Sequence, residues 1–312
     1  MSTAPAREDR AAGDGRTGST GSAVSTASPA GRPPRDLSER ARFVRRETVR
    51  LIDVAKTGHY SSVFSAAEIL AALYYRVMRL REGEPDWPER DRLVLSKGHV
   101  AVGVYPILAD LGYFDPSLLD SYTRLGNPLG DHPNMREVPG IDFSSGSLGH
   151  GLSIGLGMAL GARLQGFEKS RTFVLLGDGE LNEGQNWEAA MAASHFRASR
   201  LIAIVDRNAL SLDGPTEEVL ALEPLAEKWR AFGWEVFGVD GHDADRVADV
   251  LDEAAASSSD KPRVVIARTV KGKGVSFMED GREWHLGWLA PPDRDLVYEE
   301  LAAAEALKGG RP

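Results

Sequence analysis

The sequence contains no cysteine among its 312 residues. A disulfide scaffold, a thiolate zinc site, an iron–sulfur cluster and a cysteine nucleophile are therefore excluded. A long hydrophobic run is also missing. The most apolar stretch, residues 148–164, contains several glycines, His150 and Arg163, and it is shorter than the roughly 20 apolar residues of a membrane-spanning helix. Because no apolar signal-peptide core stands at the start, we expect a cytoplasmic protein.

Basic residues are too few for a typical nucleic-acid-binding protein. The 37 Lys and Arg stand against 46 Asp and Glu, which gives a formal net charge of -9, whereas proteins that read nucleic acid are usually basic. Hydrophobic residues make up 42 % and charged residues 27 %, the balance of an ordinary globular protein. We therefore expect neither nucleic acid nor a membrane as a partner.

The first 36 residues differ from the rest of the chain. They are almost wholly small, polar or charged, and Val24 is their only branched aliphatic residue. Such a segment cannot bury enough apolar surface to offset the entropy lost on ordering, so residues 1–36 are predicted to be a disordered tail. Residues 37–312 have the length of one large α/β domain.

Apolar periodicity predicts helices and strands in alternation. A helix is expected over residues 37–52, with a stop at Thr57-Gly58. A second is expected from Ser65, which has capping-box spacing to Glu68, to about Met78. Short apolar runs predict strands at Leu93–Leu95, Thr172–Leu176, Leu201–Val205, Glu235–Val239 and Val264–Ala267. The alternation indicates an α/β fold with a doubly wound, mostly parallel sheet and helices on both faces.

Four glycines lie on the helix predicted after residue 150, namely Gly151, Gly155, Gly157 and Gly161. We interpret them as positions where this helix packs closely on the sheet or on a neighbouring helix. Direct contact between the helix and a cofactor is the alternative.

Two oxygen-bearing side chains follow neighbouring strands. Asp178, in Gly177-Asp178-Gly179, ends the strand over 172–176, and Asn208 follows the next strand about thirty residues later. Ligands of parallel α/β sheets bind at the carboxyl ends of the strands. Carboxylate and carboxamide oxygens suit Mg²⁺ or Ca²⁺, usually completed by water and phosphate oxygens. A Gly-Asp-Gly alone is more often a turn, but the combined spacing indicates a metal and phosphate site.

Four histidines stand in loops or at element ends: His59, His99, His132 and His285. Functional sites concentrate in such segments. An imidazole can hold a phosphate, polarise a carbonyl or move a proton near neutral pH. The other three, His150, His195 and His242, we interpret as structural.

With these motifs in order, the chain resembles the N-terminal, diphosphate-binding half of transketolase, and most closely the small subunit of split transketolases. The resemblance runs from about Asp36 to Pro292. Its motifs are Thr57-Gly58-His59, Leu95-Ser96-Lys97-Gly98-His99, Gly146-Ser147-Leu148-Gly149, Gly177-Asp178-Gly179-Glu180-Leu181-Asn182-Glu183-Gly184, Asp206-Arg207-Asn208, Lys271-Gly272-Lys273-Gly274-Val275 and Trp284-His285.

The resemblance implies a thiamine-diphosphate-binding fold of the diphosphate-binding (PP) type. Its cofactors would be thiamine diphosphate and Mg²⁺, with Ca²⁺ or Mn²⁺ as substitutes. Asp178, Asn208 and the backbone carbonyl of Leu210 would bind the metal, and the Gly179 N–H would meet the diphosphate. The thiamine rings would be lined by Gly146, Ser147 and Leu148.

The same resemblance assigns catalytic roles. His99 and His285 would contact the diphosphate or the reacting centre. His59 and His285 would stabilise charge on oxygen and move protons as the carbon–carbon bond of the sugar breaks. His132 would bind substrate hydroxyls, and Glu183 matches an interface glutamate implicated in relaying protons between two sites.

The sequence departs from the family at Tyr60, Ser147 and Leu286. Many transketolases have Pro-Gly-Ala where Tyr60-Ser61-Ser62 follows His59, and proline in place of Ser147. Tyr60 and Leu286 are expected to flank the substrate entrance, so these changes bear on substrate identity.

The family's cofactor-activating glutamate belongs to a pyrimidine-binding domain that these 312 residues do not contain. A separate partner chain is therefore expected to supply it, in an α2β2 heterotetramer that acts on sugar phosphates. The implied activity is transfer of a two-carbon ketol unit from a ketose to an aldehyde. Alternatives are a relative with specialised, secondary-metabolic substrates, the alpha chain of a 2-oxo acid dehydrogenase, and a non-catalytic cofactor-binding scaffold. A deoxyxylulose-phosphate synthase is disfavoured because it is normally one longer chain.

Overall fold

The computed structural model describes residues 35–309. Of the tail expected over residues 1–36, the first 34 lie outside this range. Arg35 donates to the Asp110 carboxylate at 2.7 Å, and the Asp36 side chain accepts from the N–H of Glu39 at 2.9 Å, which caps the first helix. Within the described range, no helix combines the length and the apolar character that crossing a membrane requires.

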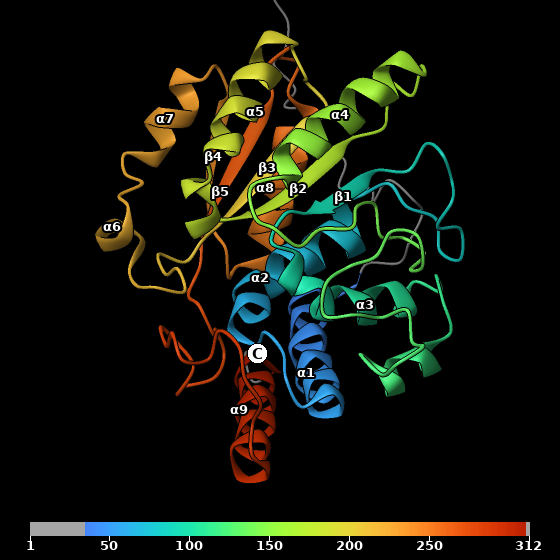
Figure 1. The fold of residues 1–312 in the computed structure, drawn as a ribbon, viewed down its shortest axis with the longest axis vertical. Coiled ribbons are helices and arrows are strands. Elements are labelled where there is room, and N and C mark those ends of the chain that lie inside the picture. Colours follow the sequence, from blue (N-terminus) through green and yellow to red (C-terminus); the bar gives the residue numbers. More distant parts are fainter. Residues whose placement is uncertain (1–34, 310–312) are drawn as a thin grey trace, which may run out of the picture.

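One five-stranded sheet forms the centre of the molecule (Figure 1). Its strands are β1 (Arg92–Leu95), β2 (Thr172–Gly177), β3 (Leu201–Arg207), β4 (Glu235–Asp240) and β5 (Arg263–Arg268). They lie in the order β1-β2-β3-β5-β4, and every adjacent pair is parallel. The five predicted strands and the parallel sheet are confirmed.

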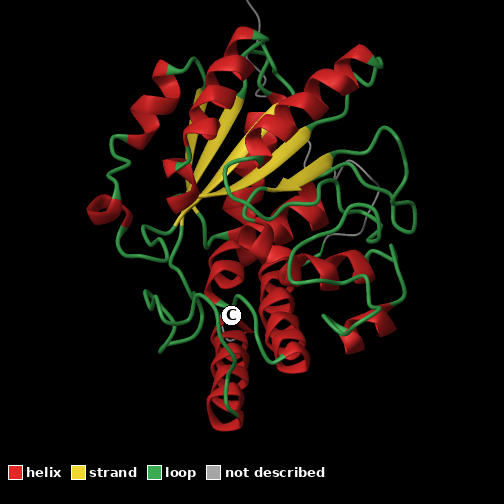
Figure 2. Ribbon diagram, in the orientation of Figure 1, coloured by secondary structure: helices red, strands yellow, loops and turns green. Residues whose placement is uncertain are grey.

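Helices cover both faces of this sheet (Figure 2), as predicted. Alternate residues of β2 divide between two cores: Phe173 and Leu175 point to one, and Val174 and Leu176 to the other. The first core contains α1 (Leu37–Ala55), α2 (Ser61–Ala72), α3 (Ala101–Asp110) and α8 (Ala244–Ala256). The second contains α4 (Gly151–Leu164), α5 (Gly184–His195) and α7 (Leu225–Ala231).

The remaining helical segments are short or peripheral. They are the π-helix Leu73–Val77, the 3-10 helices Gly98–Val100, Pro116–Ser121 and Gly179–Asn182, the helix α6 (Thr216–Val219) and the helix α9 (Pro291–Gly309). The last of these contacts α1, at the end of the molecule away from α4 and α5 (Figure 1).

The predicted start of the second helix is wrong. α2 begins at Ser61, and Ser65 lies inside it, where its hydroxyl donates to the Asp206 carboxylate at 2.6 Å. Glu68 makes a bidentate pair with Arg45 instead of closing a capping box. Both side chains are buried, so long-range partners replace the local cap that their spacing indicated.

The glycines of α4 are not equivalent. A Cβ on Gly155 would lie 2.4 Å from Cγ2 of Val174 on β2, and one on Gly151 would lie 2.4 Å from Cβ of Ser96. Close packing is therefore confirmed at these two positions. A Cβ on Gly157 or Gly161 would meet no atom of the described chain within 4 Å.

This contrast yields a matched pair of substitutions. Gly155→Ala is expected to lower the free energy of unfolding by about 1–3 kcal/mol, because the added methyl group overpacks the contact with β2. Gly157→Ala is expected to raise it by about 0.4–1 kcal/mol, because alanine has less backbone freedom to lose on folding. Urea denaturation of both variants, followed by circular dichroism, measures the difference. Equal changes in the free energy of unfolding of the two variants would contradict the close packing of Gly155 on β2.

Candidate active site

The two expected metal-ligand side chains come together at the carboxyl end of the sheet. Asp178 follows β2 and Asn208 follows β3, and these two strands are hydrogen-bonded neighbours. Asp178 is 1 % exposed and Asn208 is 8 % exposed. The Asp178 carboxylate accepts from the Ala209 N–H at 2.6 Å and from Arg207 at 3.1 Å, so its orientation is fixed.

The surroundings of Asp178 fit a bound cation. Burial and the neighbouring Asp206 carboxylate raise the pKa of Asp178 above its ordinary value. A nearby cation would therefore stabilise the ionised form. The Gly179 N–H, expected to meet a diphosphate, here donates to the Asp178 carboxylate at 2.8 Å. Within the described residues, no group of three or more His, Asp or Glu side chains could hold a metal, so any metal here needs carbonyl, amide or ligand oxygens as well.

Two buried lysines at the same edge fit an anion. Lys97 pairs with Asp206, and both side chains are almost inaccessible. Lys271 is 3 % exposed and contacts the Leu210 carbonyl at 3.4 Å. Burial and the Lys97 charge lower the pKa of Lys271 to about 8. The carboxylates of Asp178 and Asp206 attract this ammonium but do not outweigh its burial, so a phosphate beside Lys271 would add a direct countercharge.

Neither lysine was singled out from the sequence. The available signal was their place in the motifs Ser96-Lys97-Gly98-His99 and Lys271-Gly272-Lys273-Gly274. Because lysine is usually exposed, only the structure shows that these two are buried beside the metal-ligand candidates.

The four expected histidines form one cluster from four separate segments. The His59 ring centroid lies 4.9 Å from that of His99, 5.2 Å from that of His285 and 6.2 Å from that of His132. The His99 and His285 centroids are 5.4 Å apart. His242 contacts Glu68 and His195 packs against Phe196, whereas His150 is exposed. The interpretation of these three histidines as structural stays a prediction.

The cluster contains imidazoles with opposite pKa shifts. Burial and the Lys97 charge hold the pKa of His99 well below its usual range. Burial and the Lys271 charge lower the pKa of His285 to about 4. A hydrogen bond to Asp131 raises the pKa of His132. Near neutral pH, His99 and His285 are therefore neutral groups that can accept a proton or a hydrogen bond.

Glu180 ties three site motifs together. Its buried carboxylate accepts from the Ser96 hydroxyl, from the Gly149 N–H at 2.8 Å and from the Gly177 N–H at 2.9 Å. Sequence reasoning missed this role because its partners lie far apart in the chain. The only signal was an acidic residue directly after Gly-Asp-Gly.

The residues expected to face the thiamine rings and the subunit interface lie on the surface. Gly146, Ser147 and Leu148 are exposed, and so is Glu183, which precedes α5. A Cβ on Gly149 would lie 2.6 Å from Cβ of Glu183, so the two groups are neighbours. Their roles toward cofactor and partner stay predictions.

Tyr60 is not at a substrate entrance. Its side chain is fully buried against Phe64, and its hydroxyl accepts from the Leu289 N–H at 3.3 Å. The residue therefore fixes the segment after His285 instead of contacting substrate. Leu286, the other residue expected at the entrance, is 53 % exposed.

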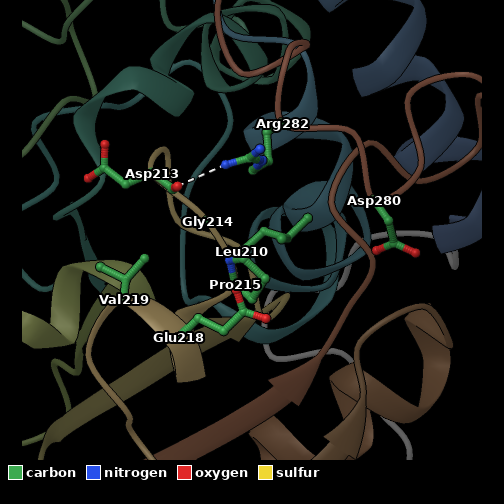
Figure 3. Close-up of a pocket in the computed structure, with 8 residues that line it drawn as sticks. All are labelled: Leu210, Asp213, Gly214, Pro215, Glu218, Val219, Asp280 and Arg282. Atoms are coloured by element: carbon green, nitrogen blue, oxygen red, sulfur yellow. Dashed lines mark hydrogen bonds between the residues drawn. The ribbon is translucent and has the colours of Figure 1, made fainter.

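A surface cavity of about 510 Å³ adjoins the loop of the metal-ligand candidates (Figure 3). Arg282 lines it, and its guanidinium donates to the Asp213 carbonyl at 2.8 Å. Its lining is Leu210, Asp213, Gly214, Pro215, Glu218, Val219, Asp280 and Arg282. None of the clustered histidines lines this cavity, which reaches the site only through Leu210.

The carboxyl edge of this parallel α/β sheet holds an oriented carboxylate, an amide and two buried lysines, an arrangement whose chemistry suits a phosphorylated ligand. The family model of the transketolase thiamine diphosphate-binding domain matches residues 38–301. The chain belongs to the transketolase family and corresponds to this domain. The predicted family, the fold class and the transketolase-type transferase assignment are thereby confirmed.

Two bacterial relatives are subunits by name. The 6-deoxy-6-sulfo-D-fructose transketolase subunit SqwG of Clostridium sp. (strain MSTE9) is 43 % identical over 88 % of this chain and 98 % of its own length. An apulose-4-phosphate transketolase subunit of Phocaeicola vulgatus is 40 % identical over 78 % of this chain and 85 % of its own length.

Solved transketolases share the fold over most of this chain. The Campylobacter jejuni enzyme aligns with a TM-score of 0.79 at 28 % identity, over 85 % of this chain. The Pichia stipitis enzyme crystallised with sedoheptulose 7-phosphate aligns with a TM-score of 0.78 at 29 % identity. The chain spans 42 % and 40 % of these two proteins, which are therefore more than twice as long as the matched region.

The charge of Lys271 should add to burial in keeping His285 unprotonated. Lys271→Met removes a positive charge that lowers the His285 pKa, so this pKa should rise from about 4 and the imidazole should stay protonated to higher pH. Lys273→Met is the matched control, because Lys273 is partly exposed and pairs with Glu279. Histidine ring signals followed by NMR against pH measure both variants. An unchanged His285 midpoint in Lys271→Met would refute the coupling.

Proposed function

We propose that the chain is the diphosphate-binding subunit of a heteromeric, thiamine-diphosphate-dependent transketolase. It transfers a two-carbon ketol unit from a ketose phosphate to an aldehyde. The observation that carries this proposal is the position of the buried Asp178, Asn208 and Lys271 at the strand edge of a transketolase-family domain.

In this proposal, Asp178, Asn208 and the Leu210 carbonyl hold Mg²⁺, or Ca²⁺ or Mn²⁺ in its place. Their oxygens are hard ligands of the kind these cations prefer. The Gly179 N–H and the Lys271 ammonium bind the diphosphate. In the structure this ammonium contacts the Leu210 carbonyl. The surface of Gly146, Ser147 and Leu148 receives the thiamine rings. When bound, thiamine diphosphate supplies carbanion stabilisation for the two-carbon unit.

The histidines act on the sugar. His59 lies beside His285 and His99 at the centre of the cluster. It donates a hydrogen bond to the substrate oxygen on which negative charge develops. His285, neutral near pH 7, accepts and returns a proton at the same oxygen. His99 contacts the diphosphate or the reacting centre, and His132 binds substrate hydroxyls.

A partner chain completes the site. The relatives that this chain spans almost fully are named as transketolase subunits, and the residues expected at the thiamine rings and at Glu183 are exposed. The partner supplies the cofactor-activating glutamate and the pyrimidine-binding domain, in an α2β2 assembly where Glu183 relays protons between sites. We place the assembly in the cytoplasm, with sugar phosphates as substrates and no nucleic-acid or membrane partner.

A specialised donor or acceptor is the second candidate. It is favoured by the sulfofructose and apulose 4-phosphate names of the two relatives. The chemistry and the roles of the residues are the same for both candidates, and only the substrate differs.

Ketol transfer is the direct test. Xylulose 5-phosphate and ribose 5-phosphate, with thiamine diphosphate and Mg²⁺, are given to the chain alone and to the chain co-expressed with a pyrimidine-domain subunit. Activity only in the mixture is expected. Activity of the chain alone would overturn the divided site. Cofactor binding by the mixture without transfer would favour the specialised candidate, and failure to bind cofactor would refute both.

Two alanine variants separate binding from catalysis. Asp178→Ala should abolish Mg²⁺-dependent cofactor binding, because it removes the only carboxylate among the proposed metal ligands. His59→Ala should leave binding largely intact and slow turnover by about 10²–10⁴-fold, the usual contribution of a positioned acid–base group. Calorimetric titration with cofactor and steady-state kinetics measure the two effects. Normal cofactor binding by Asp178→Ala would show that the metal assignment is wrong.

A further inference from the structure

Asp131 lies between two histidines of the cluster, His59 and His132. One carboxylate oxygen, Oδ1, is 3.5 Å from Nδ1 of His59, and the other, Oδ2, is 3.3 Å from Nδ1 of His132. These two rings come from different loops, one before α2 and one between α3 and α4. A single carboxylate therefore bridges the centre of the cluster and its most exposed member.

The segment that carries Asp131 is held firmly. The hydroxyl of Tyr105, a fully buried residue of α3, donates to the Gly130 carbonyl at 2.9 Å and lies 3.3 Å from the His132 carbonyl. Backbone groups on both sides of Asp131 are thus anchored to the core. The hydroxyl of buried Tyr122 also faces the Asp131 carboxylate.

The two oxygens of Asp131 have different surroundings. Oδ1 is buried with Nδ1 of His59 and the Tyr122 hydroxyl, and none of the three atoms makes a hydrogen bond in the described structure. The Asp131 side chain as a whole is nevertheless 35 % exposed, so its accessible part lies on the Oδ2 side, next to His132. Oδ1 can orient His59 from within the protein, while Oδ2 can meet a substrate.

The carboxylate stays ionised in this setting. Burial raises the pKa of Asp131, but His132 and His59 outweigh it and hold the pKa below its usual range. The titratable groups that face this carboxylate are His59, His132, Tyr122 and Tyr105. An ionised carboxylate accepts hydrogen bonds and cannot donate them. A substrate hydroxyl can donate to Oδ2, whereas a second carboxylate or a phosphate would meet a like charge.

We propose that Asp131 is a positioning and specificity-determining residue, whose carboxylate orients His59 and His132 and favours a hydroxyl over an anionic group next to the reacting carbon. The specificity part rests on the proposed function. The histidine rings lie only 4.9–6.2 Å apart around His59. His132, which is proposed to bind substrate hydroxyls, has its Nδ1 3.3 Å from Oδ2 of Asp131, so a substituent bound at His132 falls within reach of this carboxylate.

Two small acceptors test the specificity. Glycolaldehyde and glyoxylate have the same two carbons, with a hydroxyl in one and a carboxylate in the other beside the aldehyde. In the complex with the partner subunit, Asp131→Asn should shift the ratio of kcat/KM for glyoxylate over glycolaldehyde upward by about tenfold or more. Thiamine diphosphate affinity should stay within about twofold of the wild type, because Asp131 does not touch the proposed cofactor ligands.

Two further variants serve as controls. Asp131→Glu keeps the charge and should retain the wild-type preference for glycolaldehyde. Asp86→Asn removes an equal charge from an exposed site and should behave as the wild type. A ratio that stays within twofold of the wild type in Asp131→Asn would overturn the specificity role.

Histidine NMR on the full chain tests the positioning role without any activity. Asp131→Asn should lower the titration midpoint of His132, because it removes the carboxylate that raises this pKa. An unchanged midpoint would refute the contact. If the wild-type complex transfers to neither acceptor, the specificity role fails, while transfer to ribose 5-phosphate still decides the proposed function and the His132 midpoint decides the positioning role.

Discussion

The buried ion pair of Lys97 and Asp206 is the interaction on which the site depends. Asp206 is the second-last residue of β3 and also accepts from the hydroxyls of Ser65 on α2 and Thr269 after β5. One carboxylate thus joins a helix and the ends of three strand segments. Breaking a buried pair from one side leaves an uncompensated charge, which is strongly destabilising. The pair is therefore a geometric constraint: it fixes the loop that leads to His99 and the strand end that leads to Asn208.

The same pair shapes the electrostatics of the cluster. Lys97 satisfies Asp206, yet its charge still lowers the pKa of His99 and of Lys271. Lys271 in turn lowers the pKa of His285. Lys97 is paired directly with Asp206, whereas Lys271 has only the electrostatic attraction of Asp178 and Asp206 to offset its burial. Under the proposed function, a diphosphate would give Lys271 a direct countercharge, and this would weaken the charge effect that adds to burial in keeping His285 neutral. Cofactor binding and protonation of His285 would then be coupled.

The sequence predicted features that depend on local pattern or general topology. The strands follow from short apolar runs, and the approach of Asp178 to Asn208 follows from their places at adjacent parallel strand ends. Prediction from the sequence failed where the position of a side chain depends on a hydrogen-bond partner far away in the chain. The Ser65 cap is replaced by a bond to Asp206, 141 positions away. Glu180 acts through Ser96, 84 positions away, and Gly149. The burial of Lys271 could not be predicted, because lysine is usually exposed and the neighbouring residues in the sequence do not indicate otherwise.

The two halves of the proposed cofactor site differ in burial. Under the proposed function, this difference explains where the active site is divided between two chains. The groups proposed for the metal and diphosphate are buried and tied to the sheet by Glu180, Asp206 and Asp178. The groups proposed for the thiamine rings, residues 146–148, are exposed, and a Cβ on Gly146 would meet no atom of the described chain within 4 Å. A charged diphosphate needs preorganised donors, because buried charges without partners are costly. Under the proposed function, the flat rings need a second wall and the cofactor-activating glutamate, which the partner chain supplies on docking. The division between chains would then fall across the rings and leave the metal- and diphosphate-binding half of the site in this chain.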